Sequence, residues 1–305
     1  MSARPERAQG SARNERRRLN EIFLTLPSLV WLGVFFFVPT LIVFAIAFRP
    51  ADPYGGIGDG WTLETIRRMV SPNYPAIIWR TFLLSVAATF ICLTLAVPVG
   101  YCLARVGRRW RQWILLLVVI PFWTNFLVRV FAWKSLLATN GSFRLALVWL
   151  GVLGEDQPIL FTPVAILLVL VYTYLPFAIL PVYASAEKFD FSLLEAARDL
   201  GASSGKAFFR VFLPGISRGL ATAAIMVLVP SLGSYVIPDL VGGASSEMLG
   251  NKIAQYVYTE RNLPRASALS AILTVVVVAL LILFLWWSLR RDRSGSGVKK
   301  GGLFT

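Results

Sequence analysis

Few residues in this sequence could perform catalysis. It has no histidine, and its two cysteines, Cys92 and Cys102, lie ten residues apart in one apolar run. On a helix they would be about 15 Å apart, which is too far for a disulfide. The stretch GASSGKAF lacks the G-x-x-x-x-G-K-[ST] spacing of a phosphate-binding loop. Histidine-based catalysis and metal binding are thereby excluded, and we expect no catalytic residue, no metal and no bound cofactor on this chain.

One carboxylate, that of Asp239, borders an apolar run in the stretch SYVIPDLVGG. An acid at the edge of a membrane-spanning helix is costly and often functional, so Asp239 could line a pathway. The alternative is a solvated aspartate that caps a helix or turn. The acids Glu155, Asp156, Glu247 and Glu260 lie in polar links, where we expect them to be solvated or to meet the basic residues of a docking protein.

The elements that position these residues are apolar. The chain has 305 residues, of which 56% are hydrophobic and 15% charged, whereas soluble domains have about 25% charged residues. Pro230, Gly233 and Pro238 interrupt one apolar run and predict a broken helix of the kind that often lines a pathway. The sequence predicts an all-α polytopic membrane protein with six transmembrane helices of roughly 20 residues or more, near 24–48, 81–104, 112–133, 160–184, 216–238 and 267–289.

Lysine and arginine are unevenly distributed among the polar stretches. The two tails and the segments 105–111 and 185–218 contain 20 of them, whereas the links 49–80, 134–159 and 239–265 contain nine. This bias predicts that both termini and the 185–218 segment face the cytoplasm, and it argues against nucleic acid as the reason for the net charge of +14. We expect a disordered basic tail over 1–19, a transmembrane domain over 20–290 and a flexible tail over 291–305.

Two other stretches have competing interpretations. The first apolar run could be a signal peptide, since Ala45-Ile46-Ala47 resembles a cleavage site. The run is longer than the 7–15 residues of a signal core, so we expect an uncleaved first span. The stretch FRLALVWLGVL in the link 134–159 is too short to cross a membrane and predicts a surface or re-entrant helix.

The polar segment 192–214 has signals for two short helices. Ser192 stands three residues before Glu195, the spacing of a capping box, so a helix should begin near Leu193. Gly201 is placed to end that helix, because glycine enters the left-handed conformation freely. Ser203 or Ser204 can then cap a second helix through KAFFRVF, which Pro214 should stop.

Such a pair of helices could dock on another protein. Ala196 and Ala197 would leave a thin surface on the first helix, and apolar contacts would come from Leu194, Phe208, Phe209 and Phe212. The alternative is an amphipathic pair on the membrane surface, with its basic residues on anionic lipid. The residues alone do not favour either interpretation.

The spacing within the segment resembles a known motif. Glu195-Ala196-Ala197 is followed after three residues by Gly201 and, nine residues later, by VFLP from Val211. This pattern resembles the EAA motif of ATP-binding-cassette (ABC) importer permeases, with Val in place of Ile. The resemblance implies coupling helices that sit in a cleft of an ATPase subunit, formed by Glu195, Ala196, Ala197, Asp199, Gly201, Leu213 and Pro214.

Longer stretches are similar to the spermidine/putrescine permease subunits of that family. They are VIPFWTNFLVRV, FTPVAILLVLVYTYLPFAILPVYASAEKFD and SYVIPDLVGGASSEMLGNKI. The resemblance implies a type I ABC importer (MetI-like) permease fold in the bacterial inner membrane and ATP-driven import of a polyamine by alternating access. It also implies a second related permease subunit, two ATPase copies that hold ATP and Mg, and an extracytoplasmic binding protein. Related permeases carry other solutes, such as an iron complex or an amino-acid-like compound.

A path for a polyamine needs carboxylates, carbonyl groups or aromatic faces. The candidates are Asp239, Tyr235, Trp123, Asn125, Tyr172 and Tyr174, although each aromatic ring alone could simply pack between helices. Arg129 would repel a cation, and we expect it to extend to the outer interface in a structural role.

Two other classes of membrane protein fit less well. A stand-alone secondary transporter needs charged coupling residues within its spans, and a membrane-embedded enzyme needs clustered catalytic or metal-binding residues. The spans are nearly free of acids, histidine is absent, and the remaining acids are scattered.

Overall fold

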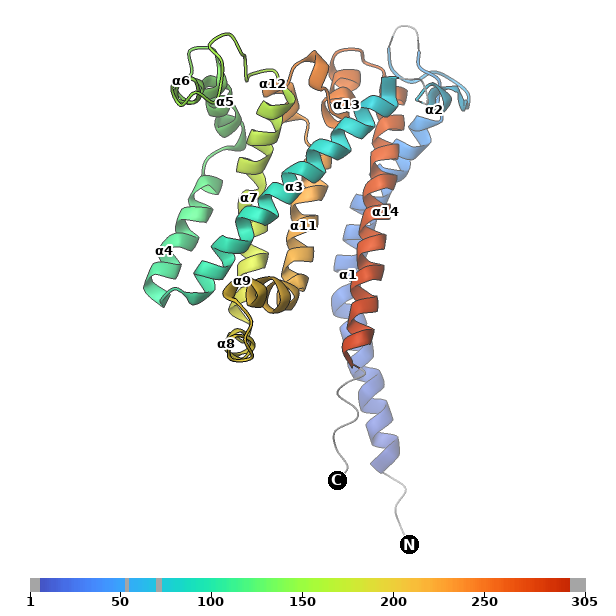
Figure 1. Ribbon diagram of the computed structural model, residues 1–305. Coiled ribbons are helices and arrows are strands. Elements are labelled where there is room, and N and C mark those ends of the chain that lie inside the picture. The colour runs from blue at the N-terminus through green and yellow to red at the C-terminus, as the bar shows by residue number, and fades with distance from the viewer. Residues whose placement is uncertain (1–5, 53–54, 70–72, 297–305) are drawn as a thin grey trace.

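The computed structural model describes residues 6–52, 55–69 and 73–296, which are built from helices and the links between them (Figure 1). Four helices are each long and apolar enough to cross a membrane, and two bent pairs of helices could each form one further span, which gives up to six spans in the described part. The four long helices are α1 (Glu6–Ala47), α3 (Asn73–Arg105), α7 (Pro163–Glu187) and α14 (Leu263–Ser296).

Short helices gather at the two ends of these spans. The start of α1 and the end of α14 lie toward the same end of the molecule as α8 (Ser192–Asp199) and α9 (Ser204–Ala207) (Figure 1). The opposite end carries α2 (Glu64–Arg68), α5 (Phe126–Leu137), α6 (Ser142–Trp149), α12 (Val236–Val241) and α13 (Leu249–Tyr258). We call these the α8 end and the α13 end. The expected placement of the 185–218 segment on the same side as both ends of the chain agrees with this arrangement.

The core is formed where α3 packs along α7 and α11 (Ser217–Leu232) packs against both. Small and branched apolar residues fill this contact, among them Ala96, Val182 and Ala223, all fully buried. A Cβ atom at Gly219 of α11 would lie 2.4 Å from the Cβ of Ser185 on α7, so only glycine permits this approach of the two helices. Helices α1 and α14 pack on each other and stand apart from this core at the α8 end (Figure 1).

The third expected span is not the single helix that we predicted over 112–133. It consists of α4 (Arg108–Val119) and a 3-10 turn, η1 (Ile120–Trp123), after which the chain bends by 93° into α5 and α6. Thr124 is extended, and the side-chain oxygen of Asn125 accepts the N–H of Leu127 at 2.8 Å, so a new helix begins there. The expected short helix in the link 134–159 is α6.

The link after α6 is held by a buried arginine. The side chain of Arg144 donates to the carbonyl oxygens of Thr139 at 2.9 Å, of Gln157 at 3.3 Å and of Glu155. Only 6% of Arg144 is exposed. One guanidinium group therefore satisfies carbonyl groups on both sides of α6 and fixes the fold of this link.

The fifth span is interrupted, as the sequence predicts. Helix α11 ends at Leu232, Gly233 follows it, and α12 begins at Val236. At the other end, α11 meets the preceding helical segment, Ser204–Gly215, at 69°. The expectation that Pro214 stops this preceding segment agrees with the structure to within one residue, because the segment ends at Gly215. Up to that residue the chain stays helical through the π-helical turn η2 (Phe208–Phe212) and α10 (Leu213–Gly215).

The ends of the chain differ from expectation. Helix α1 begins at Glu6 and α14 continues to Ser296, where we expected a disordered tail over 1–19 and a flexible one from 291. Alanine, arginine, glutamate and glutamine are good helix formers, so the apolar helix can extend into the polar sequence before it. Residues 1–5 and 297–305 of these tails lie outside the described residues.

Candidate functional site

Helix α8 begins with a cap that differs from the one we predicted. The helix starts at Ser192, one residue before the expected position, but Ser192 does not form a capping box with Glu195. Instead, the side-chain oxygen of Asp190 accepts the hydroxyl of Ser192 at 2.7 Å and its backbone N–H at 3.0 Å. These two hydrogen bonds hold the pKa of the Asp190 carboxyl below its usual range. An ionised aspartate thus starts the helix, where negative charge is favourable.

Gly201 ends α8 in the way that the sequence predicts. Its φ is +87°, in the left-handed region. The N–H of Gly201 donates to the carbonyl of Arg198 at 2.8 Å, and the N–H of Ala202 donates to that of Ala197 at 3.0 Å. These two bonds form a Schellman motif. Ser203 then caps α9 by accepting the N–H of Lys206 at 3.4 Å, so the expected helix, turn and second helix are present.

An aromatic cluster fixes this segment to the core. The fully buried ring of Phe212 lies between 5.0 and 5.2 Å from the rings of Tyr101, Phe189 and Phe208, measured between centroids. Tyr101 belongs to α3, and its hydroxyl accepts a hydrogen bond from Arg105 at 2.7 Å. Aromatic contacts at these distances are stabilising beyond the area that they bury. The segment is therefore attached rigidly to the α8 end of α3.

Of the four apolar residues that we expected to supply contacts from this segment, only Phe209 is exposed. Leu194 and Phe212 are buried within the chain, so they cannot supply contacts to a partner. Phe208 is half-buried, whereas Leu193 and Leu200, which we did not expect, are exposed together with Phe209. Leu200 is 89% exposed. Leu193 and Leu200 are separated by seven residues and therefore share one face of the α8 turn with Ala196, which is also exposed. Of the residues of the expected coupling motif, Glu195, Asp199, Gly201 and Pro214 are exposed as well, whereas Ala197 and Leu213 are half-buried.

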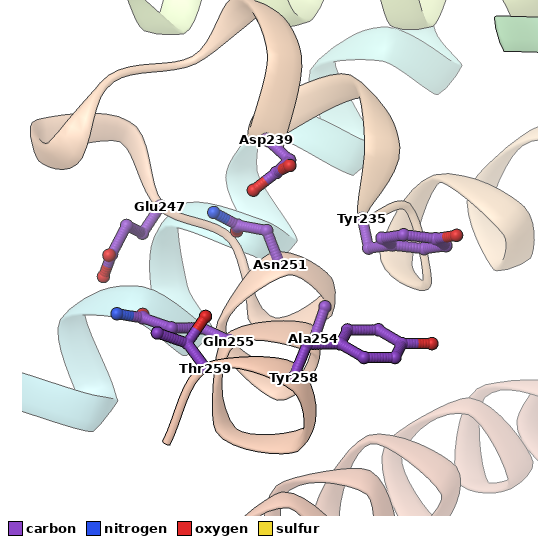
Figure 2. A pocket seen from close by; sticks show the side chains of 8 residues that line it. All are labelled: Tyr235, Asp239, Glu247, Asn251, Ala254, Gln255, Tyr258 and Thr259. Carbon is purple, nitrogen blue, oxygen red and sulfur yellow. The ribbon is translucent and has the colours of Figure 1, made fainter. Parts of the chain in front are cut away.

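A pocket of about 390 Å³ opens at the α13 end, between α12 and α13 (Figure 2). A second hollow of about 270 Å³ adjoins it and shares three of its lining residues. Figure 2 shows Asp239 across from Asn251 and the rings of Tyr235 and Tyr258 along one edge. We call this the outer pocket; it is lined by Tyr235, Asp239, Glu247, Asn251, Ala254, Gln255, Tyr258 and Thr259.

The two carboxylates of the outer pocket have different surroundings. The carboxylate of Asp239 is exposed and makes no hydrogen bond or ion pair with another residue that the structure describes. The carboxylate of Glu247 lies 4.0 Å from the ammonium nitrogen of Lys252. With amide, hydroxyl and aromatic groups around them, these carboxylates form a site suited to a cation with several donors.

Only two of the six expected pathway residues line this pocket: Asp239 and Tyr235. Trp123 is 78% exposed beside the break in the third span, and Asn125 uses its side-chain oxygen to cap α5. Tyr172 packs against Trp133 of α5, with the ring centroids 5.2 Å apart.

Tyr174 and Arg129 have packing contacts of their own. The Tyr174 hydroxyl donates to the carbonyl of Pro230 at 3.2 Å and so joins α7 to α11 at the point where α11 is interrupted. The guanidinium carbon of Arg129 lies 5.4 Å from the ring centroid of Phe122 and 5.9 Å from that of Phe126. Its place between aromatic rings at the break is consistent with the structural role that we expected.

The sequence analysis missed the contribution of α13 to the pocket. It expected Glu247 to be solvated or to meet a docking protein, and it did not single out Asn251, Gln255 or Tyr258. The signal was present, because residues 251, 255 and 258 recur at helical spacing and place polar groups on one face of a short helix.

Comparison with known proteins agrees with these features. Residues 96–293 match the family described as "Binding-protein-dependent transport system inner membrane component". The chain is 37% identical over 254 residues to the spermidine/putrescine transport system permease protein PotB of Haemophilus influenzae, an alignment that covers 83% of this chain and 89% of that one. It is 36% identical to PotB of Escherichia coli K12, covering 83% and 92%, and 35% identical to PotB of Salmonella typhimurium LT2, covering 89% and 94%.

The fold is also found in solved structures. A bacterial ABC transporter involved in the import of the acidic polysaccharide alginate superposes with a TM-score of 0.69 at 16% identity, covering 91% of this chain and 98% of that one. The same kind of transporter in complex with its alginate pentasaccharide-bound periplasmic protein gives a TM-score of 0.67 at 16% identity, covering 89% and 94%. These matches show the type I ABC importer permease fold. Together with the family match and the sequence identities, they establish that this chain belongs to the binding-protein-dependent transport system inner membrane components, as a non-catalytic permease subunit.

Proposed function

We propose that this chain is the permease subunit of an ABC importer that moves a polyamine, such as spermidine or putrescine, into the cytoplasm. The observation that carries this proposal is the outer pocket, where the interrupted fifth span brings the carboxylates of Asp239 and Glu247 together with Tyr235 and Tyr258. Polyamines are chains of methylene groups with two or more ammonium groups. Carboxylates pair with the ammonium groups, and aromatic rings contact both the charges and the methylenes.

The names of the relatives support the same substrate class. Relatives between 35% and 37% identical to this chain are described as spermidine/putrescine permeases. The transporter with the similar fold imports an acidic polysaccharide, which would be repelled by an acidic pocket. The pocket therefore favours a cationic solute over an anionic one.

The exposed face of the α8–α10 segment would dock on an ATPase subunit. Leu193, Leu200 and Phe209 present apolar area to the solvent, and the Schellman motif at Gly201 fixes the angle between the two helices. The aromatic cluster around Phe212 joins this segment to α3, so a displacement of α8 would be passed to the core. ATP and Mg would be held by a pair of these ATPase subunits, and closure of the pair would turn the cavity outward.

A second permease subunit would complete the membrane part. Within this chain, most of the apolar stretch Thr25–Ala47 of α1 is exposed, and α4 has no buried residue. The side chains of Trp110, Trp113 and Leu117 on α4 are each more than 60% exposed. Such surfaces are suited to lipid and to the helices of a related subunit.

The orientation follows from charge. The lysine and arginine bias supports a cytoplasmic position for the α8 end, with the start of α1 and the end of α14. The α13 end and the outer pocket would then face an extracytoplasmic binding protein, in agreement with the family description.

Reconstitution of the whole complex tests this function. The permease, its partner subunits and its binding protein would be assembled in proteoliposomes, with ATP inside and the binding protein and labelled spermidine or putrescine outside. Uptake that needs both ATP and the binding protein supports the proposal. If the binding protein stimulates ATP hydrolysis but no polyamine enters, the polyamine assignment is refuted and another solute must be sought.

A further inference from the structure

Lys252 of α13 holds its ammonium group beside the outer pocket. The nitrogen donates to the side-chain oxygen of Gln255 at 2.8 Å and lies 4.0 Å from a carboxylate oxygen of Glu247. It also lies 5.2 Å from the ring centroid of Tyr256, over the ring. The Lys252 side chain is only 18% exposed. This ammonium is therefore surrounded by a carboxylate, an amide oxygen and an aromatic face.

These are the three kinds of group that would bind the ammonium of a polyamine. Two of them, Glu247 and Gln255, line the outer pocket. The pocket thus has one carboxylate, Asp239, that has no partner among the described residues, and a second, Glu247, that faces a cation of the chain itself. A substrate with an ammonium at each end can use both carboxylates only if Lys252 gives up its place.

We propose that Lys252 is a tethered competitor, whose ammonium occupies one cation-binding position of the outer pocket until a substrate ammonium displaces it. This inference rests on the proposed function and extends it to the regulation of the site. In the resting state the lysine offsets part of the negative charge of the pocket. During transport it would return to Glu247 as the substrate leaves, which keeps the affinity low enough for release.

A structural role for Lys252 predicts a different outcome. Lysine at this spacing from Gln255 and Tyr256 can simply support a helix through contacts between residues three and four apart. Removal of the lysine would then loosen α13 and leave polyamine binding unchanged or weaker. Competition predicts that removal strengthens binding, because the apparent affinity of a site is lowered by the fraction of time that the site is occupied.

The test uses the assembled complex in lipid nanodiscs and measures the binding of labelled spermidine without the binding protein. We expect Lys252→Met to bind spermidine about threefold more tightly or better than the wild type. Lys252→Arg, which keeps the charge, should bind as the wild type does. Lys134→Met is the matched control, because it removes a lysine from α5 at the same end of the molecule but outside the pocket, and it should change nothing.

Chemical labelling gives a second readout that does not depend on affinity. In the wild-type complex, spermidine should raise the modification of Lys252 by an amine-reactive reagent relative to that of Lys134, because the displaced ammonium leaves its sheltered position. The ratio is needed because the amines of spermidine also consume the reagent. Mass spectrometry of the modified peptide measures this change, with Lys134 as the internal reference.

Two results overturn the inference. One is binding by Lys252→Met that is no tighter than binding by the wild type, including the case in which neither binds. The other is labelling of Lys252, relative to that of Lys134, that spermidine leaves unchanged or slows. The uptake assay described above distinguishes this failure from that of the proposed function: polyamine uptake by the wild-type complex together with either result refutes the role of Lys252 alone.

Discussion

Substitution of Gly201 by alanine should weaken the docking of the ATPase through the backbone alone. Gly201 has a φ of +87°, and a Cβ atom added there would meet nothing within 4 Å. The alanine therefore causes no clash within the chain. Its cost is that of placing an L-residue in the left-handed region, about 1–2 kcal/mol. If the docked conformation needs this turn, the affinity for the ATPase should fall by about fivefold to thirtyfold.

Gly205 supplies the matched control. It lies four residues further along the same segment, also with open space around a Cβ atom, but inside α9 and without a positive φ. Gly205→Ala should leave docking intact, because alanine is a better helix former than glycine by about 1 kcal/mol. Gly201→Asn should lie between the wild type and Gly201→Ala, because asparagine tolerates the left-handed region better than alanine.

The assay is a titration of the purified ATPase against the permease pair in nanodiscs, followed by ATP hydrolysis stimulated by the binding protein. Equal affinities for Gly201→Ala and Gly205→Ala would refute the argument from backbone conformation. Full affinity in all three variants would remove Gly201 from the docking surface altogether.

Three further perturbations follow from contacts described above. Gly219→Leu should lower the thermal unfolding midpoint of the chain in detergent, since overpacking the contact between α11 and α7 costs about 1–3 kcal/mol or more. Gly33→Leu should leave the midpoint unchanged, because a Cβ atom at Gly33 would meet nothing within 4 Å. Similar midpoints for the two variants would contradict the close approach of α11 and α7. Arg144→Met should leave three carbonyl groups without their donor, which should lower the stability of the chain by at least about 2 kcal/mol. Amide hydrogen exchange in the link that flanks α6 should then become faster. Unchanged exchange would show that the guanidinium does not hold this link. Asp239→Asn should reduce polyamine uptake by about tenfold or more without loss of complex assembly. Asp156→Asn, outside the pocket, should leave uptake unchanged. Normal uptake by Asp239→Asn would mean that Asp239 is only a solvated cap.

Local signals in the sequence predicted the turn of the 192–214 segment correctly. Gly201 and Ser203 act through their own backbone and side chain, so their roles can be inferred from neighbouring residues. The start of α8 was harder, because Asp190 and Ser192 can both cap a helix and only the fold selects between them. The exposure of Leu193 and the burial of Leu194 depend on which face of α8 meets the aromatic cluster. That face is set by contacts between residues far apart in the sequence.

The bend in the third span shows the same limit. Hydropathy predicts one span over 112–133, because the average apolar character of a stretch does not show whether the helix axis changes direction within it. The bend coincides with the extended backbone at Thr124 and with the packing of α5 beside α12, two helices that lie far apart in the sequence. Only part of the outer pocket could be predicted from the sequence, for a related reason. Asp239 stands out because it borders an apolar run, whereas Gln255 is recognised as a lining residue only when α13 is placed opposite α12.

The exposed surfaces of α1 and α4 have a consequence for how the subunit is made. A helix that leaves most of its apolar surface outside the core of its own chain gains much of its packing free energy only when neighbouring subunits arrive, so the stability of this part of the protein depends on their concentration. The cell would therefore need to synthesise the subunits in matched amounts. Overproduction of this chain alone should increase the pool of unassembled, protease-sensitive protein and leave the number of working transporters unchanged.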